Sequence, residues 1–157
     1  MIASTDLAPP ARRELHALLE QDRASEQRFR EAGDHVHDAA LTALCYELAQ
    51  RHRDFARELQ RLLNEPGPAS NDRPHLRRVE RVTGWWRAVR RLTVGDQAAT
   101  LRSLERTEAR TRCRYDAALR RLRPPGVRRL LHQHHRSIRD AHKQLRALRR
   151  RYAERAV

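Results

Sequence analysis

The stretch NEPGPASNDRP, residues 64–74, interrupts a mostly helical pattern with three prolines, a glycine and several short polar side chains. Clusters of this composition form turns and end helices. The apolar spacing before the stretch predicts a helix over 39–63, and the spacing after it predicts a shorter helix over 75–92. The connection from 64 to 95 is therefore long enough to run the whole length of a helical bundle.

The remaining breaks in the pattern are short. Pro9 and Pro10 suit the first turn of a helix, where a missing backbone amide costs nothing. Gly33 is expected to end that helix. The links at 33–38 and 123–126 are so short that the helices on either side must pack as antiparallel hairpins. Together these signals predict helices over about 9–32, 39–63, 75–92, 96–122 and 125–153.

Four long helices with one long crossover are typical of a ferritin-like bundle and differ from a simple up-down-up-down bundle. We therefore expect an all-α fold: a ferritin-like four-helix bundle with a short extra helix in the crossover between helices 2 and 3. The length of 157 residues suits one domain over 1–157. A coiled-coil dimer is the alternative architecture, but the prolines and glycines interrupt any continuous heptad.

Charge is distributed unevenly along the chain. Residues 1–72 hold 9 basic and 13 acidic residues, whereas residues 73–157 hold 25 basic and 7 acidic residues, for a formal net charge of +14. This asymmetry favours an anionic partner: nucleic acid, an acidic protein or a phospholipid surface. The alternative is that arginine is simply the solubilising residue here, because Lys143 is the only lysine.

In the segment 73–92, arginines alternate with Trp85 and Trp86, a combination typical of phosphate-binding and single-strand-binding surfaces. The alternative interpretation packs the tryptophans against the flank of the bundle, because Trp86 shares a stripe with apolar residues. The arginines that we assign to a candidate anion-binding face are Arg77, Arg78, Arg81, Arg87, Arg90, Arg91, Arg128 and Arg129.

Several function classes find no support in the sequence. No run approaches the ~18 apolar residues of a membrane span, and the first residues lack the pattern of a secretory signal. The two cysteines, Cys45 and Cys113, lie far apart, which suits a reducing cytoplasm better than a disulfide framework. No phosphate-binding glycine loop or nucleophile motif is present. We expect a cytoplasmic protein without catalytic residues and without membrane contact.

Polar residues occupy positions on the apolar stripes that leucine would fill in a pure core. Counted from the hairpin turns, they fall near mid-height of the bundle, where carboxylates and imidazoles could hold two iron or manganese ions. The Glu-x-x-His pairs typical of such centres are missing, so the alternative is a buried ion-paired network. We expect no cofactor, with iron or manganese as the alternative. The six residues are Asp22, Glu26, His52, Glu105, Glu108 and His142.

Four segments carry a family resemblance: LERTEARTRCRYDAAL (104–119), ELAQRHRDFARELQ (47–60), HRSIRDAHKQLRALR (135–149) and GWWRAVRRLTVGD (84–96). They resemble a ferritin-like family of small bacterial four-helix-bundle proteins that is classed as a domain of unknown function. The resemblance covers about residues 13–150 and implies a ferritin-like fold. It brings no established activity with it.

The same resemblance places Glu105, Glu108, Tyr115 and His142 on residues typical of the family. At position 52, where the family's arginine is expected, this chain has histidine. Arginine cannot ligate a metal, so the family pattern itself favours an ion-paired core over a di-iron centre.

The other histidines and the cysteines have simpler interpretations. We expect Cys113, which lies among arginines, to be a small core residue in mid-helix. The remaining histidine clusters are expected at the solvated or half-buried surface, and comprise His35, His37, His132, His134 and His135.

The sequence thus predicts a non-catalytic helical bundle, with a role in stress or metal handling suggested by fold analogy alone. The first alternative is a basic module that binds nucleic acid or an acidic partner through its arginine-rich C-terminal half. The second is a di-metal carboxylate–histidine protein. A homodimer is compatible with each of these.

Overall fold

The structure, a computed structural model, describes residues 7–63 and 97–155. Within these ranges the chain forms four helices and no strand: α1 (Pro9–His35), α2 (Ala39–Leu63), α4 (Gln97–Arg121) and α5 (Pro125–Arg155). The expected all-α helical bundle is therefore confirmed. The helix expected over 75–92 and the crossover that would hold it lie outside the described residues.

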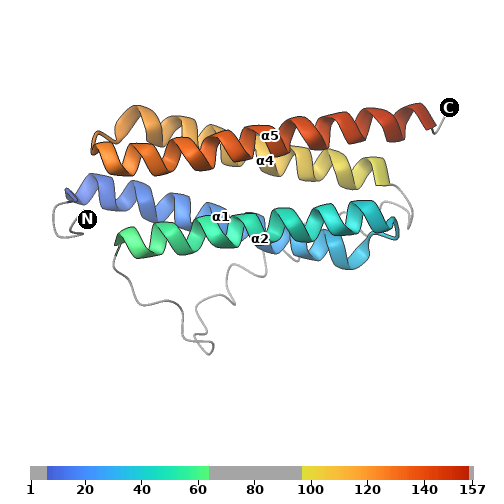
Figure 1. Ribbon diagram of the computed structural model, residues 1–157, viewed down its shortest axis with the longest axis horizontal. Helices are drawn as coiled ribbons and strands as arrows, with labels where there is room; N and C mark the ends of the chain where they lie inside the picture. The colour runs from blue at the N-terminus through green and yellow to red at the C-terminus, as the bar shows by residue number, and fades with distance from the viewer. Residues whose placement is uncertain (1–6, 64–96, 156–157) are drawn as a thin grey trace.

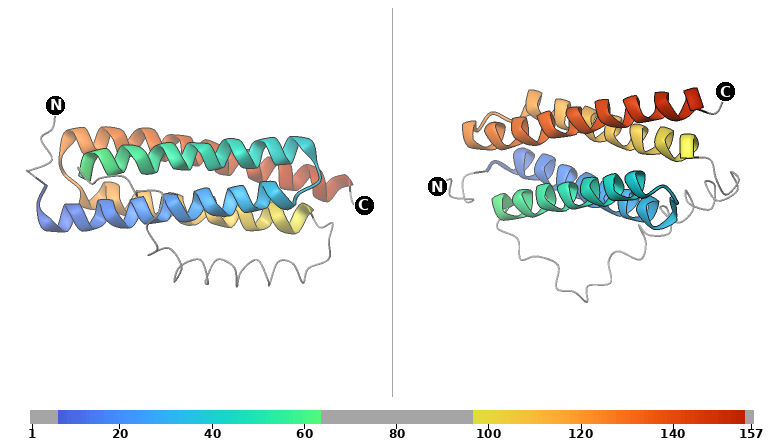
Figure 2. Two further views of the ribbon diagram at one scale, coloured as in Figure 1. Left: turned by 90° about the horizontal axis from the view of Figure 1, so that it is seen from below. Right: turned by 45° about the vertical axis from the view of Figure 1, so that its right-hand side comes forward.

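The helices form two antiparallel hairpins that are stacked as two layers (Figures 1 and 2). Helices α1 and α2 make one layer, and α4 and α5 make the other. Between the layers, α1 packs mainly against α4, whereas α2 touches α5 less extensively. None of the helices that the structure describes is long and apolar enough to cross a membrane.

Local sequence explains the helix ends. Pro9 and Pro10 occupy the first turn of α1. At the start of α2, the Asp38 carboxylate accepts a hydrogen bond from the Leu41 amide at 2.8 Å, as expected of an N-cap. At the end of α4, the Arg128 guanidinium donates to the carbonyls of Leu119 and Leu122 at 2.6 and 3.2 Å. Arg128 therefore caps a helix from within the next one.

Helix α1 continues to His35 and does not stop at Gly33, the residue expected to end it. Gly33 lies where the two helices of the first hairpin approach each other closely. A Cβ atom there would come within 3.2 Å of the Tyr46 ring and 3.3 Å of the Cys45 Cβ. The glycine is therefore needed for close packing of the two helices. A glycine is also common at helix ends, so the sequence alone does not distinguish the two roles.

Among residues 7–63 and 97–155, the apolar core consists of two clusters separated along the bundle axis. One contains Leu15, Leu59 and Leu131, and the other contains Leu48 and Leu104. On α1, α2 and α4, buried polar residues lie in the sequence between the members of these clusters. The bundle therefore has a polar layer in the middle of its core.

Candidate functional site

The middle of the polar layer is a histidine held between two carboxylates. His52, Asp22 and Glu108 come from three different helices, and each side chain is fully buried. The His52 Nδ1 lies 2.9 Å from Asp22 Oδ1, and its Nε2 lies 3.1 Å from Glu108 Oε1. Since ionised carboxylates only accept hydrogen bonds, both ring nitrogens act as donors.

The surroundings of His52 stabilise its charged form. Burial alone would lower the pKa of His52, but the hydrogen bonds and negative charges of Asp22 and Glu108 outweigh this effect and raise the pKa to about 9. His52 is therefore an imidazolium at neutral pH. With a hydrogen on each nitrogen, it has no lone pair to offer to a metal ion.

The network continues from Asp22 to the surface through three further side chains. Asp22 Oδ2 accepts a hydrogen bond from the Tyr115 hydroxyl at 2.5 Å, and the Tyr115 oxygen lies 3.1 Å from His134 Nδ1. His134 Nε2 then lies 2.7 Å from Glu58 Oε2, on a side chain that is 42% exposed. Six side chains thus form one hydrogen-bonded chain from buried Glu108 to the surface.

The donors in this chain can be assigned by counting hydrogens. The single hydroxyl hydrogen of Tyr115 is directed to Asp22, so the Tyr115 oxygen accepts from His134 Nδ1. Burial and the charge of Asp22 raise the pKa of Tyr115 well above its usual value, which keeps this hydroxyl protonated. The four links from Glu108 to His134 then each have one donor and one acceptor.

Aromatic rings enclose the two imidazoles. The His52 ring stacks on Phe29 with a centroid distance of 5.6 Å and meets the edge of Phe55 at 5.8 Å. The other imidazole, His134, stacks on Phe55 at 4.1 Å. A cation on an aromatic face is stabilised by the ring quadrupole, and the rings also exclude water.

One hydrogen bond of the polar layer is missing: Glu108 Oε2 has no hydrogen-bond partner among the described residues.

The six core residues singled out in the sequence do not form one cluster. Asp22, His52 and Glu108 come together, but Glu26 binds Arg53 Nε at 2.8 Å. The other two members of the set form a separate, partly buried group with an arginine. Glu105 accepts a hydrogen bond from Arg149 at 2.6 Å, and His142 lies 3.9 Å from the same carboxylate. Across residues 7–63 and 97–155, no three or more His, Cys, Asp or Glu side chains are arranged to hold a metal ion.

Two side chains of the hydrogen-bonded network, His134 and Glu58, do not follow from the sequence prediction. His134 was expected at the solvated or half-buried surface, and this is wrong: the side chain is 2% exposed. The signal was present, because His134 lies on the same helical stripe as Leu131 and Ile138. Glu58 was not singled out, since its position on a polar face gives no sign of a partner on α5.

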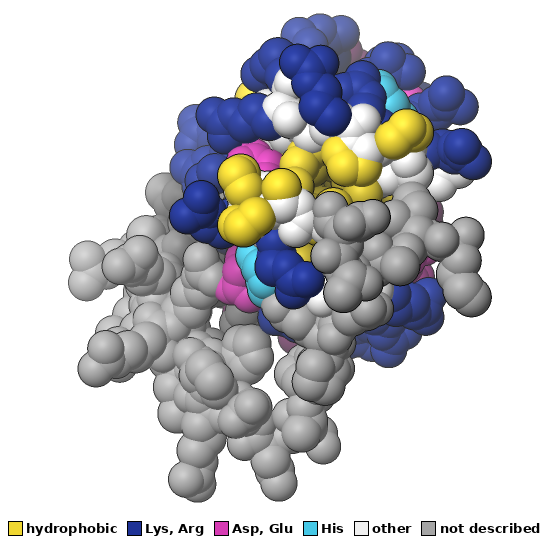
Figure 3. Space-filling view, turned by 90° about the vertical axis from the view of Figure 1, so that its left-hand side faces the viewer, with side chains coloured by type: hydrophobic (Ala, Val, Ile, Leu, Met, Phe, Trp, Pro, Cys, Tyr) yellow, Lys and Arg dark blue, Asp and Glu magenta, His cyan; other side chains and the backbone are white. Residues whose placement is uncertain are grey.

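Outside the core, charge divides the two layers. Helices α4 and α5 contain 17 Lys and Arg against five Asp and Glu, whereas α1 and α2 contain nine of each. Viewed from the end where α4 joins α5, Lys and Arg side chains crowd the part of the molecule that these two helices form (Figure 3). We call this surface the basic layer.

On α4, the basic layer includes a stripe of exposed arginines at every fourth position. Arg106, Arg110 and Arg114 are exposed, and none has a hydrogen bond or ion pair with another described residue. Residues four apart on a helix are neighbours, and like charges there are destabilising by a few tenths of a kcal/mol per pair. The stripe is therefore unfavourable for the helix alone.

The other residues singled out in the sequence differ in their exposure to solvent. Arg129 is exposed on α5, whereas Arg128 is half-buried and engaged with the α4 carbonyls. Cys113, expected in the core, is exposed, and Cys45 is buried with its pKa raised to about 12 by burial. The candidates in the crossover, Arg77, Arg78, Arg81, Arg87, Arg90 and Arg91, lie outside the described residues.

Fold and site together define a small all-α bundle with a buried histidine–carboxylate layer and one strongly basic face. The chain belongs to the family described as Domain of unknown function (DUF2383), whose model matches residues 11–121. This confirms the expected membership of a domain-of-unknown-function family. A comparison with curated proteins found no match.

Proposed function

We propose that this protein is a non-catalytic helical bundle that binds the phosphate backbone of nucleic acid through its basic layer. The observation that carries the proposal is the separation of charge between the two layers, with 17 basic and five acidic residues in one and nine of each in the other. Lys and Arg that neutralise phosphates release bound counterions, which provides affinity without base contacts.

The described surface favours backbone contacts over base recognition. Arginine presents a planar fork that matches the oxygens of a phosphate group. Base stacking needs exposed aromatic rings, and among the described residues Tyr46 on α2 is the only large apolar side chain that is exposed. Binding is therefore expected to be independent of sequence and strongly dependent on salt.

We also propose that the fold is ferritin-like and that the polar layer is structural. Helix α2 ends and α4 begins at opposite ends of the bundle (Figure 1), as a long crossover requires. The residues of the layer do not suit a di-iron or di-manganese centre, because His52 lacks a free lone pair and Glu26 and Glu105 are bound to arginines. Two free cysteines support a cytoplasmic location.

Fluorescence anisotropy with labelled single-stranded and double-stranded oligonucleotides over a salt series tests the proposal. The variant Arg106→Glu/Arg146→Glu changes one exposed arginine on each helix of the basic layer. The matched control, Arg13→Glu/Arg61→Glu, changes the net charge equally on the other layer. We expect the first variant to bind at least tenfold more weakly and to reduce the salt slope by about 2, with a much smaller effect of the control.

Equal losses in both variants would show that only net charge matters and would contradict a binding face. Absence of salt-dependent binding by the unmodified protein would reject the function itself. An acidic polypeptide serves as the competing ligand: if it binds more tightly than the oligonucleotides at equal salt, the partner is an acidic protein.

A further inference from the structure

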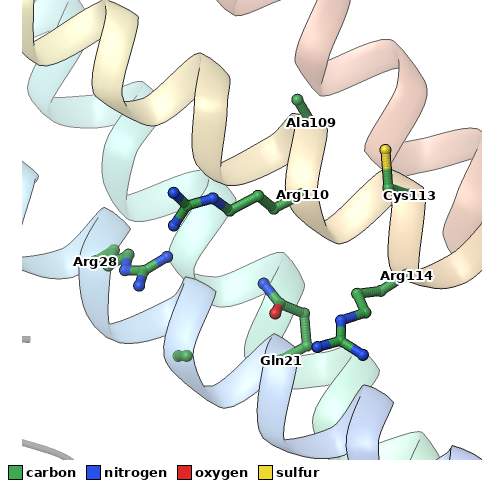
Figure 4. A pocket seen from close by; sticks show the side chains of 7 residues that line it. Gln21, Arg28, Ala109, Arg110, Cys113 and Arg114 are labelled. Carbon is green, nitrogen blue, oxygen red and sulfur yellow. The ribbon is translucent and has the colours of Figure 1, made fainter. Parts of the chain in front are cut away.

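A hollow of about 580 Å³ opens between α1 and α4, at the edge of the basic layer (Figure 4). Its lining includes Gln21 and Arg28 from α1, and Arg110, Cys113 and Arg114 from α4. The small side chains of Ala24 and Ala109 complete the lining and leave room between the helices. Three arginines therefore line one space between the helices.

Two of these arginines face each other across the hollow. The Arg28 and Arg110 side chains extend from different helices toward the same space (Figure 4). The pKa of Arg28 is lowered by partial burial and by the positive charge of Arg110, and Glu31 offsets this only in part. A half-buried cation beside a second cation is unfavourable, and an anion between the two groups would relieve the repulsion.

Hydrogen bonds beside the hollow join the two helices that line it. The Gln21 amide donates to Thr111 Oγ1 at 3.0 Å, and the Ser25 and Thr111 hydroxyls lie 2.9 Å apart. Thr111 in turn donates to the Thr107 carbonyl at 3.0 Å. Because these hydrogen bonds join α1 and α4, they fix the separation of the arginines, and a preorganised site loses less entropy when a ligand binds.

We propose that this hollow is an oxyanion site that takes a phosphate group, either as free phosphate or as part of a nucleic-acid backbone. Arg28, Arg110 and Arg114 donate to the phosphate oxygens through their planar forks. The guanidinium groups stay charged throughout the physiological range, so the arginines provide positive charge without a proton change of their own. For nucleic acid the inference rests on the proposed function, whereas for free phosphate it stands alone.

The exposed thiol of Cys113 provides a direct readout, because it lines the hollow while Cys45 is buried. The rate at which a neutral maleimide labels Cys113 is measured with inorganic phosphate, with pyrophosphate and with sodium chloride at equal ionic strength. We expect both phosphates to slow labelling severalfold and sodium chloride to have no such effect. The concentration that gives half of the protection reports the affinity of the site.

The variant Arg110→Ala/Arg114→Ala is expected to weaken this protection at least tenfold, because each charge-assisted hydrogen bond lost is worth about that factor. The control Arg13→Ala/Arg61→Ala removes the same charge from exposed positions on α1 and α2, outside the hollow, and should retain the protection. Arg110→Lys/Arg114→Lys keeps the charge, loses the fork and is expected to be intermediate. Circular dichroism and the thermal midpoint confirm that each variant is folded.

Protection that persists in Arg110→Ala/Arg114→Ala, or that sodium chloride reproduces, would overturn the site. Oligonucleotide binding that leaves Cys113 fully reactive also overturns it, while the proposed function stands. If inorganic phosphate protects Cys113 but the protein binds no oligonucleotide, the oxyanion site for free phosphate is supported and the proposed function is rejected.

Discussion

At the scale of single residues, the most consequential side chain is His52. It is fully buried as a cation between Asp22 and Glu108, and it stacks on the ring of Phe29. A buried charge is tolerated only when it is paired and hydrogen-bonded. The ion pair therefore links the stability of the fold to pH.

The first prediction concerns this pH dependence. Because the folded-state pKa of His52 is about 9, above the unfolded value of about 6.5, its stabilising contribution is complete below about pH 6.5. It is lost as the pH rises through about 9. By linkage the loss is on the order of 3 kcal/mol. Urea denaturation across this range measures it.

The variant His52→Gln supplies the reference for that measurement. It lacks the titrating imidazole, so its free energy of unfolding should change much less over the same pH range. Asp22 and Glu108 contact the ring, Tyr115 binds Asp22, and all three are present in both proteins. Parallel pH profiles for the two proteins would contradict the assignment of His52 as the titrating group.

The second prediction concerns the Tyr115 hydroxyl. Tyr115→Phe removes the hydroxyl that links Asp22 to His134. Two buried atoms, Asp22 Oδ2 and His134 Nδ1, then lose this hydrogen-bond partner. Such atoms cost about 1–3 kcal/mol. Tyr46→Phe is the matched control, since the exposed Tyr46 hydroxyl binds Asp34 at the surface. We expect a loss below about 0.5 kcal/mol there; similar midpoints for both variants in chemical denaturation would argue against the buried chain.

At the scale of helices, the start of α2 depends on one side chain. The Asp38 carboxylate satisfies the Leu41 amide, which has no partner within the helix. Asp38→Ala is expected to lower the free energy of unfolding by about 1 kcal/mol. Asp54→Ala, which removes an exposed carboxylate farther along the same helix, should change it by less than half of that. Thermal denaturation of both variants compares the two positions.

The helices and part of the polar layer could be predicted because both depend on local periodicity. Asp22, His52 and Glu108 interrupt apolar stripes, so their burial follows from the same spacing that predicts the helices. Glu26 and Glu105 lie beside those stripes and reach out to arginines on other helices. Which arginine each carboxylate binds depends on how the helices are rotated against one another. The spacing of residues along one helix gives no information about this rotation.

Glu58 shows the same limit more clearly. Its contact with His134 joins α2 to α5 over 76 positions of sequence. Only the packed bundle brings these two side chains together. Gly33 illustrates a different ambiguity, because a missing side chain can mean either a helix end or a close approach of two helices.

At the scale of the whole molecule, the uneven charge predicts a dependence on salt. The net charge of +14 destabilises the compact state by self-repulsion, much of it within the basic layer. Sodium chloride screens this repulsion and should raise the thermal midpoint. Phosphate at equal ionic strength should raise it further, because a ligand that binds only the folded state stabilises it. Equal midpoints in the two salts would contradict specific anion binding.

The hairpin of α1 and α2 carries equal numbers of acidic and basic residues, whereas the hairpin of α4 and α5 is strongly cationic. Because the two are stacked, the described bundle has an asymmetric electrostatic field that points from one layer to the other. An anionic surface, such as the proposed phosphate backbone, would therefore attract α4 and α5 first and leave α1 and α2 facing outward. In that orientation the molecule displays the hairpin that carries Glu58, the solvent-reaching carboxylate of the hydrogen-bonded network.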